Sequence, residues 1–322
     1  MKVWIWVLAI IAVVATLSLA GGRPNAPVPV PCAASDTPRR HTSPNRVLVV
    51  TNNLHSDSEE EIQQLGEARV LARRVLDDVD CPPDVLLLQE VVRASARRVA
   101  ETFTRMTTDR YVVVKSPGDS WIPVARKKVV NTETAIVVNL STMRVVDDGG
   151  WIRSPYQRAH AVGRPVVRRH AHVMVAERRG GVRIALVSVH WVRPSTLSSR
   201  EVARAYQDRW AKQIAETVDD RYPRANVKLI AGDFNQNRCV YEPSNNCEPL
   251  SPYYETLRGR RYGYVDAVFE MHKMGGVDYF FSTGDLLDAG SDGDYDKDAA
   301  EGDARRWYSD HKFRWALLGP ER

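Results

Sequence analysis

The sequence predicts a single α/β unit in which two stacked β-sheets carry helices on their outer faces. Several short segments are apolar along their whole length, and such strands need cover on both faces. Longer segments between them carry apolar residues at helical spacing, and no break in composition divides residues 46–319. Two stacked sheets with helices outside would supply that cover. The 322 residues are 43% hydrophobic and 26% charged, which excludes disorder, collagen and coiled coil for the whole chain.

The first 45 residues predict export. A short positive start precedes an apolar stretch at 3–19, and Ser18 and Ala20 fit the −3 and −1 positions of a signal-peptidase site. We therefore expect a signal peptide at 1–20, cleaved after Ala20, and a secreted protein. An uncleaved membrane anchor is the alternative, because the stretch reaches the lower limit of a membrane span. Residues 21–45 are rich in proline and predict an extended linker.

Strands and helices alternate in the first part of the domain, and strands dominate the rest. β-branched and apolar runs predict strands at 46–51 and 84–88 and near 110–115, 134–139, 165–176, 183–190, 227–231, 277–281 and 313–317. The first helix begins with a capping box at Ser58 and ends at Cys81-Pro82-Pro83. Two further helices are expected at roughly 92–106 and about 199–219, the second with Val202, Tyr206, Ile214 and Val218 facing inward.

Export to an oxidising compartment lets the four cysteines form disulfides. Cys239 and Cys247 are close enough in sequence to close a local loop, and Cys32 and Cys81 are then the remaining pair. The number of cysteines does not settle the connectivity, since three pairings are possible. The absence of a CxxC spacing disfavours a four-cysteine zinc site.

Polar residues stand where five of the predicted strands end or begin. Loops at strand ends are where a rigid scaffold presents reactive groups. Taken singly, each of these residues is more often a simple cap than a functional group. The five groups are Thr51-Asn52-Asn53, Gln89-Glu90, His190, Gly232-Asp233-Phe234-Asn235 and Ser309-Asp310-His311.

Together these motifs resemble the signature of the endonuclease/exonuclease/phosphatase superfamily, with the order T-x-N, Q-E, H, G-D-F-N, D, S-D-H. The resemblance covers about 46–319 and implies a four-layer α/β sandwich of two stacked mixed sheets flanked by helices. It also implies hydrolysis of phosphoesters with a divalent metal, usually Mg²⁺. Within the superfamily the sequence is most similar to the secreted pancreatic-type deoxyribonucleases, at 131–137, at Cys239 after the G-D-F-N motif, and at 277–279. The segments 116–131 and 285–303 have no counterpart there.

The resemblance implies that His190 and His311 are the acid and base, although it does not say which is which. A carboxylate behind each ring would fix its tautomer and keep its pKa near neutral or above. Glu133 would take this role for His190, and Asp278 would take it for His311.

The same resemblance implies a metal site and a phosphate site. Glu90 would bind Mg²⁺, or Mn²⁺ as an alternative, with Asn53 and Asp310 as helpers, because such ions prefer oxygen ligands. Asp233 would orient the attacking water.

Three residues would contact the phosphate. Asn235, as an amide, can donate to the anion without adding negative charge. Arg164 precedes a predicted strand, at a place where the resemblance implies a phosphate-contacting arginine, with Arg158, Arg168 and Arg169 as nearby alternatives. Arg193 follows the histidine motif closely. Both arginines are therefore candidates for phosphate contacts.

Two further features have a structural and a functional interpretation. His170 and His172 share one face of a predicted strand and could bind a metal, although packing is the more common role. The acidic segment 292–298 begins with the D-x-D-x-D pattern of a calcium loop, but Lys297 stands where such loops need glycine. A solvated loop is therefore favoured, with Ca²⁺ as an additional structural ion left open.

The function predicted from these residues is a secreted metal-dependent endonuclease that hydrolyses DNA, and that acts as a monomer with no protein partner implied. A net charge of +5 is consistent with an acidic partner. The first alternative is a secreted lipid phosphodiesterase or phosphatase, sphingomyelinase-like or phosphoinositide-directed, in which Trp121 or Trp151 would belong to a membrane-binding hairpin. The second alternative is a non-catalytic binding protein of the same fold.

Overall fold

The computed structural model describes residues 43–54, 65–79, 81–115, 122–124, 127–129, 133–155, 170–191, 199–235, 252–267, 277–292 and 309–320. The signal peptide at 1–20, most of the predicted linker and the capping box at Ser58 lie outside these ranges, so those predictions stay predictions. Within the described ranges, none of the helices combines the length and the apolar character that crossing a membrane requires.

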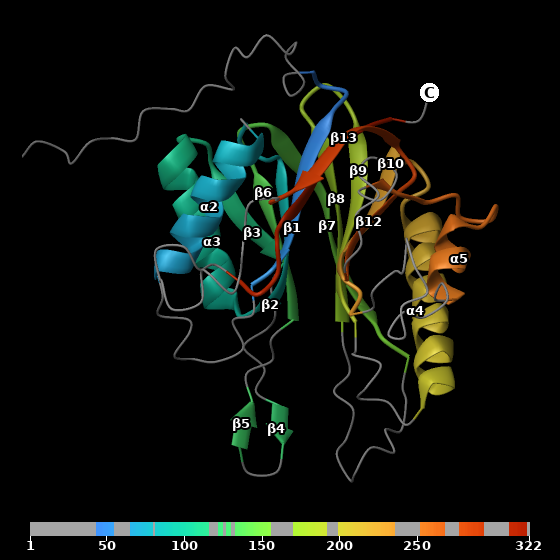
Figure 1. The fold of residues 1–322 in the computed structure, drawn as a ribbon. Helices are drawn as coiled ribbons and strands as arrows, with labels where there is room; N and C mark the ends of the chain where they lie inside the picture. Colours follow the sequence, from blue (N-terminus) through green and yellow to red (C-terminus); the bar gives the residue numbers. More distant parts are fainter. Residues whose placement is uncertain are drawn as a thin grey trace, which may run out of the picture.

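Two six-stranded sheets lie face to face at the centre of the molecule (Figure 1). The first has the order β13 (Asp285–Ser291), β14 (Arg314–Gly319), β1 (Val47–Asn53), β2 (Val85–Val91), β6 (Glu133–Asn139), β3 (Tyr111–Lys115). The second has the order β11 (Val265–Asp266), β12 (Asp278–Ser282), β10 (Val227–Asp233), β9 (Arg183–His190), β8 (His170–Arg178), β7 (Met143–Arg153). A separate two-stranded sheet pairs β4 (Ile122–Val124) with β5 (Lys127–Val129).

Both large sheets are mixed, as predicted. β1 runs parallel to β2, and β9 runs parallel to β10, whereas the other pairs are antiparallel. The two sheets meet through a buried apolar layer that includes Val49, Leu87, Leu186 and Leu229. The strands are therefore covered on both faces, which is why they are apolar along their length.

Helices form the two outer layers (Figure 1). α2 (Leu65–Val79) and α3 (Arg93–Thr107) pack on the first sheet, whereas α4 (Arg200–Arg221) and α5 (Pro252–Arg258) pack on the second. The four-layer sandwich is thus confirmed. In α4, the Ser199 side chain caps the helix by accepting a hydrogen bond from the backbone N–H of Val202 at 3.2 Å.

The predicted inward face of α4 is mostly correct. Tyr206, Ile214 and Val218 are buried against the second sheet, and Val202 is partly buried. Apolar residues at helical spacing thus identified both the helix and the side on which it packs.

The sequence missed β7 and β11 at the two edges of the second sheet and β13 at one edge of the first. β7 contains Asp147 to Gly150, a polar run typical of a loop, and it joins the sheet through register shifts on both sides of Asp147. β13 begins the segment 285–303, for which the resemblance offers no counterpart, and it pairs with β14 along its length. Acidic residues on a short edge strand discourage pairing with other chains, which hides such a strand from a hydrophobicity pattern.

The structure disfavours a calcium ligand at the start of the acidic segment. Asp292 is buried, and its two carboxylate oxygens accept hydrogen bonds from the Arg74 guanidinium at 2.5 and 2.6 Å. This bidentate pair ties α2 to the end of β13. The rest of the D-x-D-x-D pattern lies outside the described residues.

The structure describes only part of the predicted linker and one of the four cysteines. The backbone N–H of Val182 donates to the carbonyl of Pro44 at 2.9 Å, so the end of the predicted linker lies against the domain. Cys81 is buried and disulfide-bonded. Cys32, Cys239 and Cys247 lie outside the described residues, so the predicted pairing stays a prediction.

Candidate active site

The polar residues of the T-x-N and Q-E motifs lie inside the strands rather than after them, which corrects the predicted ends of these two strands, whereas Asn235 follows β10 and Ser309-Asp310-His311 precedes β14. β1 continues through Asn53, and β2 continues through Glu90. In the second sheet, Asp233 is in register with His190 on one side and with Asp278 on the other. Strand pairing therefore brings residues that are far apart in sequence to one end of the sandwich.

Gln89 joins the two sheets just behind this end. It is fully buried, and its Nε2 donates to Thr51 Oγ1 at 3.0 Å in the first sheet and to Ser188 Oγ at 3.2 Å in the second. Its backbone carbonyl accepts from the N–H of Leu54 at 2.9 Å. A fully satisfied buried amide fixes the relative position of the strands that it bonds.

Glu90 has an unusual backbone conformation that aims its side chain into the site. Its φ of 49° is in the left-handed region, and the pairing of β2 with β6 shifts register between Leu88 and Val91. Without this bulge, strict alternation would place Glu90 on the opposite face from Gln89. Strained, positive φ values outside glycine concentrate at functional sites.

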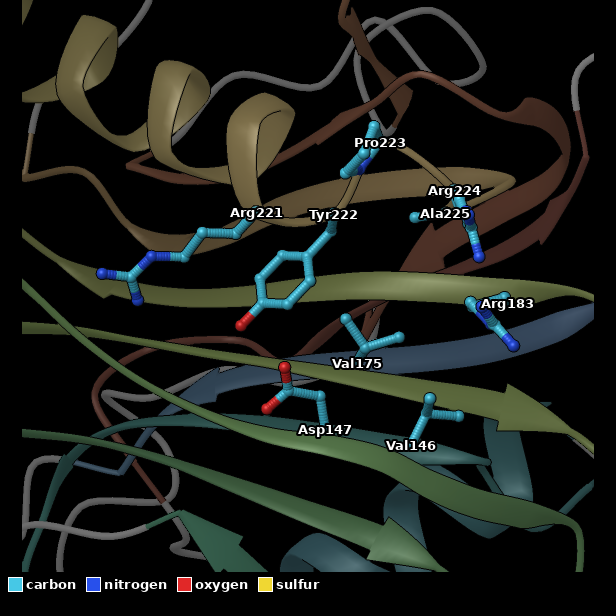
Figure 2. A pocket seen from close by; sticks show the side chains of 9 residues that line it. All are labelled: Val146, Asp147, Val175, Arg183, Arg221, Tyr222, Pro223, Arg224 and Ala225. Carbon is cyan, nitrogen blue, oxygen red and sulfur yellow. The ribbon is translucent and has the colours of Figure 1, made fainter.

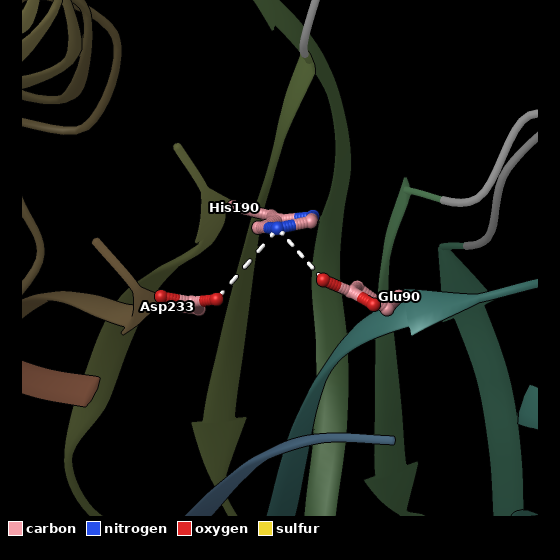
Figure 3. A group of neighbouring side chains, drawn as sticks. All are labelled: Glu90, His190 and Asp233. Atoms are coloured by element: carbon pink, nitrogen blue, oxygen red, sulfur yellow. Dashed lines mark ion pairs between the residues drawn. The ribbon is translucent and has the colours of Figure 1, made fainter. Parts of the chain in front are cut away.

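Glu90, His190 and Asp233 converge in the first cluster of the site (Figure 3). His190 Nε2 lies 3.2 Å from Glu90 Oε1 and 3.7 Å from Asp233 Oδ2. All three residues are buried. Two carboxylates thus face one ring nitrogen across the junction of the two sheets.

His311 and Asp278 form the second cluster. His311 Nδ1 is 2.9 Å from Asp278 Oδ2, the contact that the sequence predicts. Burial favours the neutral ring, but Asp278, with Asp233 and Asp310, outweighs it and raises the pKa of His311 to about 9. His311 is therefore protonated at neutral pH, and its Nδ1–H donates to Asp278.

Asn52 and Ser309 hold this cluster in place, a role that their sequence motifs did not predict. Asn52 Nδ2 donates to the backbone carbonyl of His311 at 3.2 Å, and the backbone N–H of His311 donates to Ser309 Oγ at 3.0 Å. Ser309 Oγ also donates to the carbonyl of Asn53. Their only sequence signal is membership of the T-x-N and S-D-H motifs.

Asp233 belongs to both clusters. Burial, with the nearby Asp278 carboxylate, raises the pKa of Asp233 to about 7. The His311 ring opposes this rise of the pKa, and two side-chain amides donate to the carboxylate: Asn53 Nδ2 at 3.0 Å and Asn235 Nδ2 at 3.1 Å. The backbone N–H of Asn235 donates to the other oxygen at 2.6 Å.

The side chain of Asn235 is engaged within the protein. Its Nδ2 donates to the carbonyl of Trp191 at 2.8 Å as well as to Asp233. Both amide hydrogens are therefore engaged within the protein, so here Asn235 positions Asp233. The predicted contact with a phosphate oxygen would require one of these bonds to break.

The donor set fits a divalent metal. Glu90, His190 and Asp233 form one group whose ligand atoms lie within 4.8 Å of one another, and Asp233, Asp278 and His311 form another. Asp278 Oδ1 is buried and has no hydrogen-bond partner among the described residues. Buried carboxylates that face each other are stabilised by a cation, and carboxylate oxygens suit Mg²⁺ or Mn²⁺.

The predicted metal set, Glu90 with Asn53 and Asp310, overlaps these groups in part. Glu90 belongs to one of them, but Asn53 contacts Asp233, and Asp310 is in neither. Asp310 Oδ1 lies 3.9 Å from His311 Nε2 instead. His170 and His172 are likewise in neither group within the described part of the chain.

The predicted contacts of three site residues lie outside what the structure describes. Glu133 begins β6 in register with Val91, but the predicted contact of its side chain with His190 falls outside what the structure describes. Arg164 and Arg193 lie outside the described residues, so their phosphate contacts remain predictions.

Gly232, in the G-D-F-N motif, allows β10 to approach β9 closely. Its φ is 140°, and a Cβ atom there would stand 2.1 Å from the carbonyl oxygen of Val189. A Gly232→Ala variant is therefore expected to lose roughly 2–4 kcal/mol of unfolding free energy, measured by urea denaturation.

Gly180 provides the matched control for this prediction. Its φ is 71°, but nothing lies within 4 Å of an added Cβ. Gly180→Ala should therefore lose only about 1 kcal/mol, the cost of the conformation itself. Equal losses in the two variants would contradict the close-approach argument.

A pocket of about 240 Å³ lies away from these clusters (Figure 2). Its lining includes Arg183, Arg221 and Tyr222 but none of the candidate site residues. Arg183 begins β9 and His190 ends it, so roughly 23 Å of strand separates the pocket from the site. The polar clusters, rather than this pocket, therefore mark the chemistry.

Comparison with known proteins agrees with the fold. The model of the endonuclease/exonuclease/phosphatase family matches residues 55–311. The structure of an endonuclease/exonuclease/phosphatase from Bacteroides vulgatus is 15% identical with a TM-score of 0.58, and the match covers 86% of this chain and 99% of that one. A humanized D. rerio TDP2 is 14% identical with a TM-score of 0.55, covering 85% of this chain and 99% of that one.

A third solved structure, the endonuclease/exonuclease/phosphatase from Beutenbergia cavernae, is 16% identical with a TM-score of 0.57, covering 86% of this chain and 72% of that one. A search of the curated proteins found no match. The fold and the site define a phosphoester hydrolase with a place for a divalent metal. The chain belongs to the endonuclease/exonuclease/phosphatase family.

Proposed function

We propose that this protein is a secreted, metal-dependent phosphodiesterase that cleaves nucleic acid, with DNA as its main substrate. The observation that carries the proposal is the shared position of Asp233 between two histidine clusters, one with His190 and one with His311. Two imidazoles on either side of one carboxylate can serve the two sides of a single phosphodiester. The predicted signal peptide supports secretion, and the net charge of +5 supports an anionic polymer as substrate.

The metal would sit among the clustered carboxylates. Glu90 and Asp233 would hold it, with Mg²⁺ as the proposed ion and Mn²⁺ as the alternative. When bound, a divalent cation would neutralise part of the phosphate charge. Asn53 would keep Asp233 oriented through its hydrogen bond of 3.0 Å.

His311 is the better candidate for the general acid. Asp278 accepts the Nδ1–H and leaves Nε2 to donate a proton to the leaving oxygen. The raised pKa of His311, about 9, keeps that proton in place at neutral pH. His190 Nε2 faces Glu90 and Asp233, so His190 would serve the attacking water on the other side.

The experiment that tests this function compares substrates in the same buffer with Mg²⁺. The purified protein should release acid-soluble nucleotides from plasmid DNA, and should release neither phosphate from phosphoinositides nor phosphocholine from sphingomyelin. Its KM for DNA should rise steeply with salt, because basic groups that contact phosphates displace counterions.

The control is Asp266→Asn, a buried aspartate on β11 that accepts a hydrogen bond from Tyr254 at 3.3 Å and belongs to neither metal group. This variant should keep full DNA cleavage. Release of lipid headgroups with no cleavage of DNA or RNA would replace the nuclease with the lipid phosphodiesterase.

A further inference from the structure

An exposed indole stands at the edge of the second sheet. Trp151, on β7, is 42% exposed, and it is one of three large exposed hydrophobic residues in the described part of the chain. The other two, Val146 and Val265, are aliphatic. An exposed tryptophan offers a wide π surface to a ligand.

Two histidine rings hold this indole from behind. The ring centroids of Trp151 and His172 are 3.9 Å apart with planes at 48°, and His170 meets the indole edge-on at 5.4 Å and 78°. His172 is fully buried, and its Nδ1 lies 3.0 Å from Thr134 Oγ1 on the first sheet. Burial lowers the pKa of His172 to about 3, so the ring beneath the indole is neutral.

This arrangement fixes the orientation of Trp151 before any ligand arrives. A side chain that is already ordered loses little conformational entropy on binding. The exposed surface of Trp151 is thus a rigid platform rather than a flexible chain on the surface.

Strand register places the platform beside the active site. Trp151 is opposite His172, which is opposite Ser188 on β9. Trp151, His172 and Ser188 thus form one row across the three strands. The next row toward the active site, two residues away on each strand, consists of Arg153, His170 and His190, and its side chains lie on the same face of the sheet. Because neighbouring strands are about 4.8 Å apart, the Cα atom of Arg153 lies about 10 Å from the Cα atom of His190.

The charges around the indole suit a phosphate chain. Arg153 is exposed and has no ion-pair partner among the described residues. Asp148, on the same strand, pairs with Lys115 at 3.3 Å. A lone tryptophan among charged groups differs from the continuous apolar face with which proteins enter membranes.

We propose that Trp151, supported by His170 and His172, is a stacking subsite for one unpaired nucleobase of a single-stranded nucleic acid, and that Arg153 contacts the adjoining phosphate. This inference rests on the proposed nuclease function and names the form of substrate that the site accepts. Base–aromatic stacking is tolerant of sequence, so the subsite selects unpaired strands without reading their bases.

The test is equilibrium binding, measured by fluorescence anisotropy in EDTA so that no strand is cut. The probes are a short single-stranded DNA with a terminal fluorophore and a strand of equal length made of abasic residues. Trp151→Ala should weaken binding of the base-bearing strand by roughly 5- to 100-fold and bring it near that of the abasic strand. Trp151→Phe should keep part of the difference, whereas Arg153→Ala should weaken binding of both strands.

Val146→Ala is the matched control, because Val146 is 41% exposed on the same strand and lines the distant pocket. It should change neither affinity, and circular dichroism should show that every variant is folded. Equal losses of Trp151→Ala on both strands, or no loss, would overturn the subsite. If Trp151→Ala lost binding to phosphatidylcholine–phosphatidylserine vesicles but kept its affinity for both DNA strands, Trp151 would belong to a lipid-binding surface and the subsite would be overturned.

The two proposals fail separately. If the protein cleaves DNA and its Trp151→Ala variant binds both strands with unchanged affinity, the subsite is wrong and the nuclease function stands. If the protein binds base-bearing strands through Trp151 but cleaves no nucleic acid, the proposed function is wrong and the subsite stands.

Discussion

His311→Ala is expected to lower kcat on DNA by about 10²- to 10⁴-fold, the usual contribution of a positioned general acid. The imidazole is held at Nδ1 by Asp278 at 2.9 Å, and its pKa of about 9 keeps a proton available at Nε2. Alanine removes the proton donor but leaves the strands intact. The measurement is single-turnover cleavage of DNA under saturating enzyme.

The hydrogen bond between Asp278 and His311 predicts that the effects of replacing them are not independent. Asp278→Asn should lose less than His311→Ala, because the carboxylate acts on the ring rather than on the phosphate. The double variant should then be no slower than His311→Ala alone. Multiplicative losses would show that Asp278 acts independently of His311. Asp266→Asn serves again as the buried-aspartate control.

Glu90→Gln should lower kcat by about 10²- to 10³-fold and weaken binding of Mn²⁺, followed by isothermal titration calorimetry. Glutamine keeps the size of the side chain and removes the charge that faces His190 at 3.2 Å. Excess EDTA should abolish the activity of the wild-type protein.

The control for Glu90 is Glu177→Gln, which removes another glutamate charge from the second sheet. Glu177 pairs with Arg183 at 2.9 Å, at the end of β9 opposite to His190. It should alter neither Mn²⁺ affinity nor kcat. Full activity of Glu90→Gln, or of the wild type in EDTA, would exclude the metal mechanism.

The sequence predicts the layers well because each layer has a strong local signal. The strand predicted at 183–190 coincides with β9, and the helix predicted at about 199–219 is α4 within two residues at its end. Where the signal is broken, the element is missed. The run Asp147 to Gly150 interrupts β7 with polar residues, and the register shifts around Asp147 accommodate it.

The candidate site could be predicted as a set of residues but only partly as a set of contacts. The bond between His311 and Asp278 follows from the family resemblance and is present. The approach of His190 to Glu90 depends on a bulge and a φ of 49°, which no hydrophobic pattern encodes. The same holds for Asn235, whose hydrogen bonds depend on how closely β10 approaches β9.

The amide of Gln89, which bonds to Thr51 on one sheet and Ser188 on the other, has a consequence for how this site can evolve. Glu90 is carried by one sheet and His190 by the other, so the reacting geometry is a property of their stacking. A methylene gained or lost at Leu87 or Leu229, in the layer between the sheets, would slide one half of the site against the other. Residues that never meet a substrate therefore constrain catalysis, and substitutions between the sheets must compensate one another.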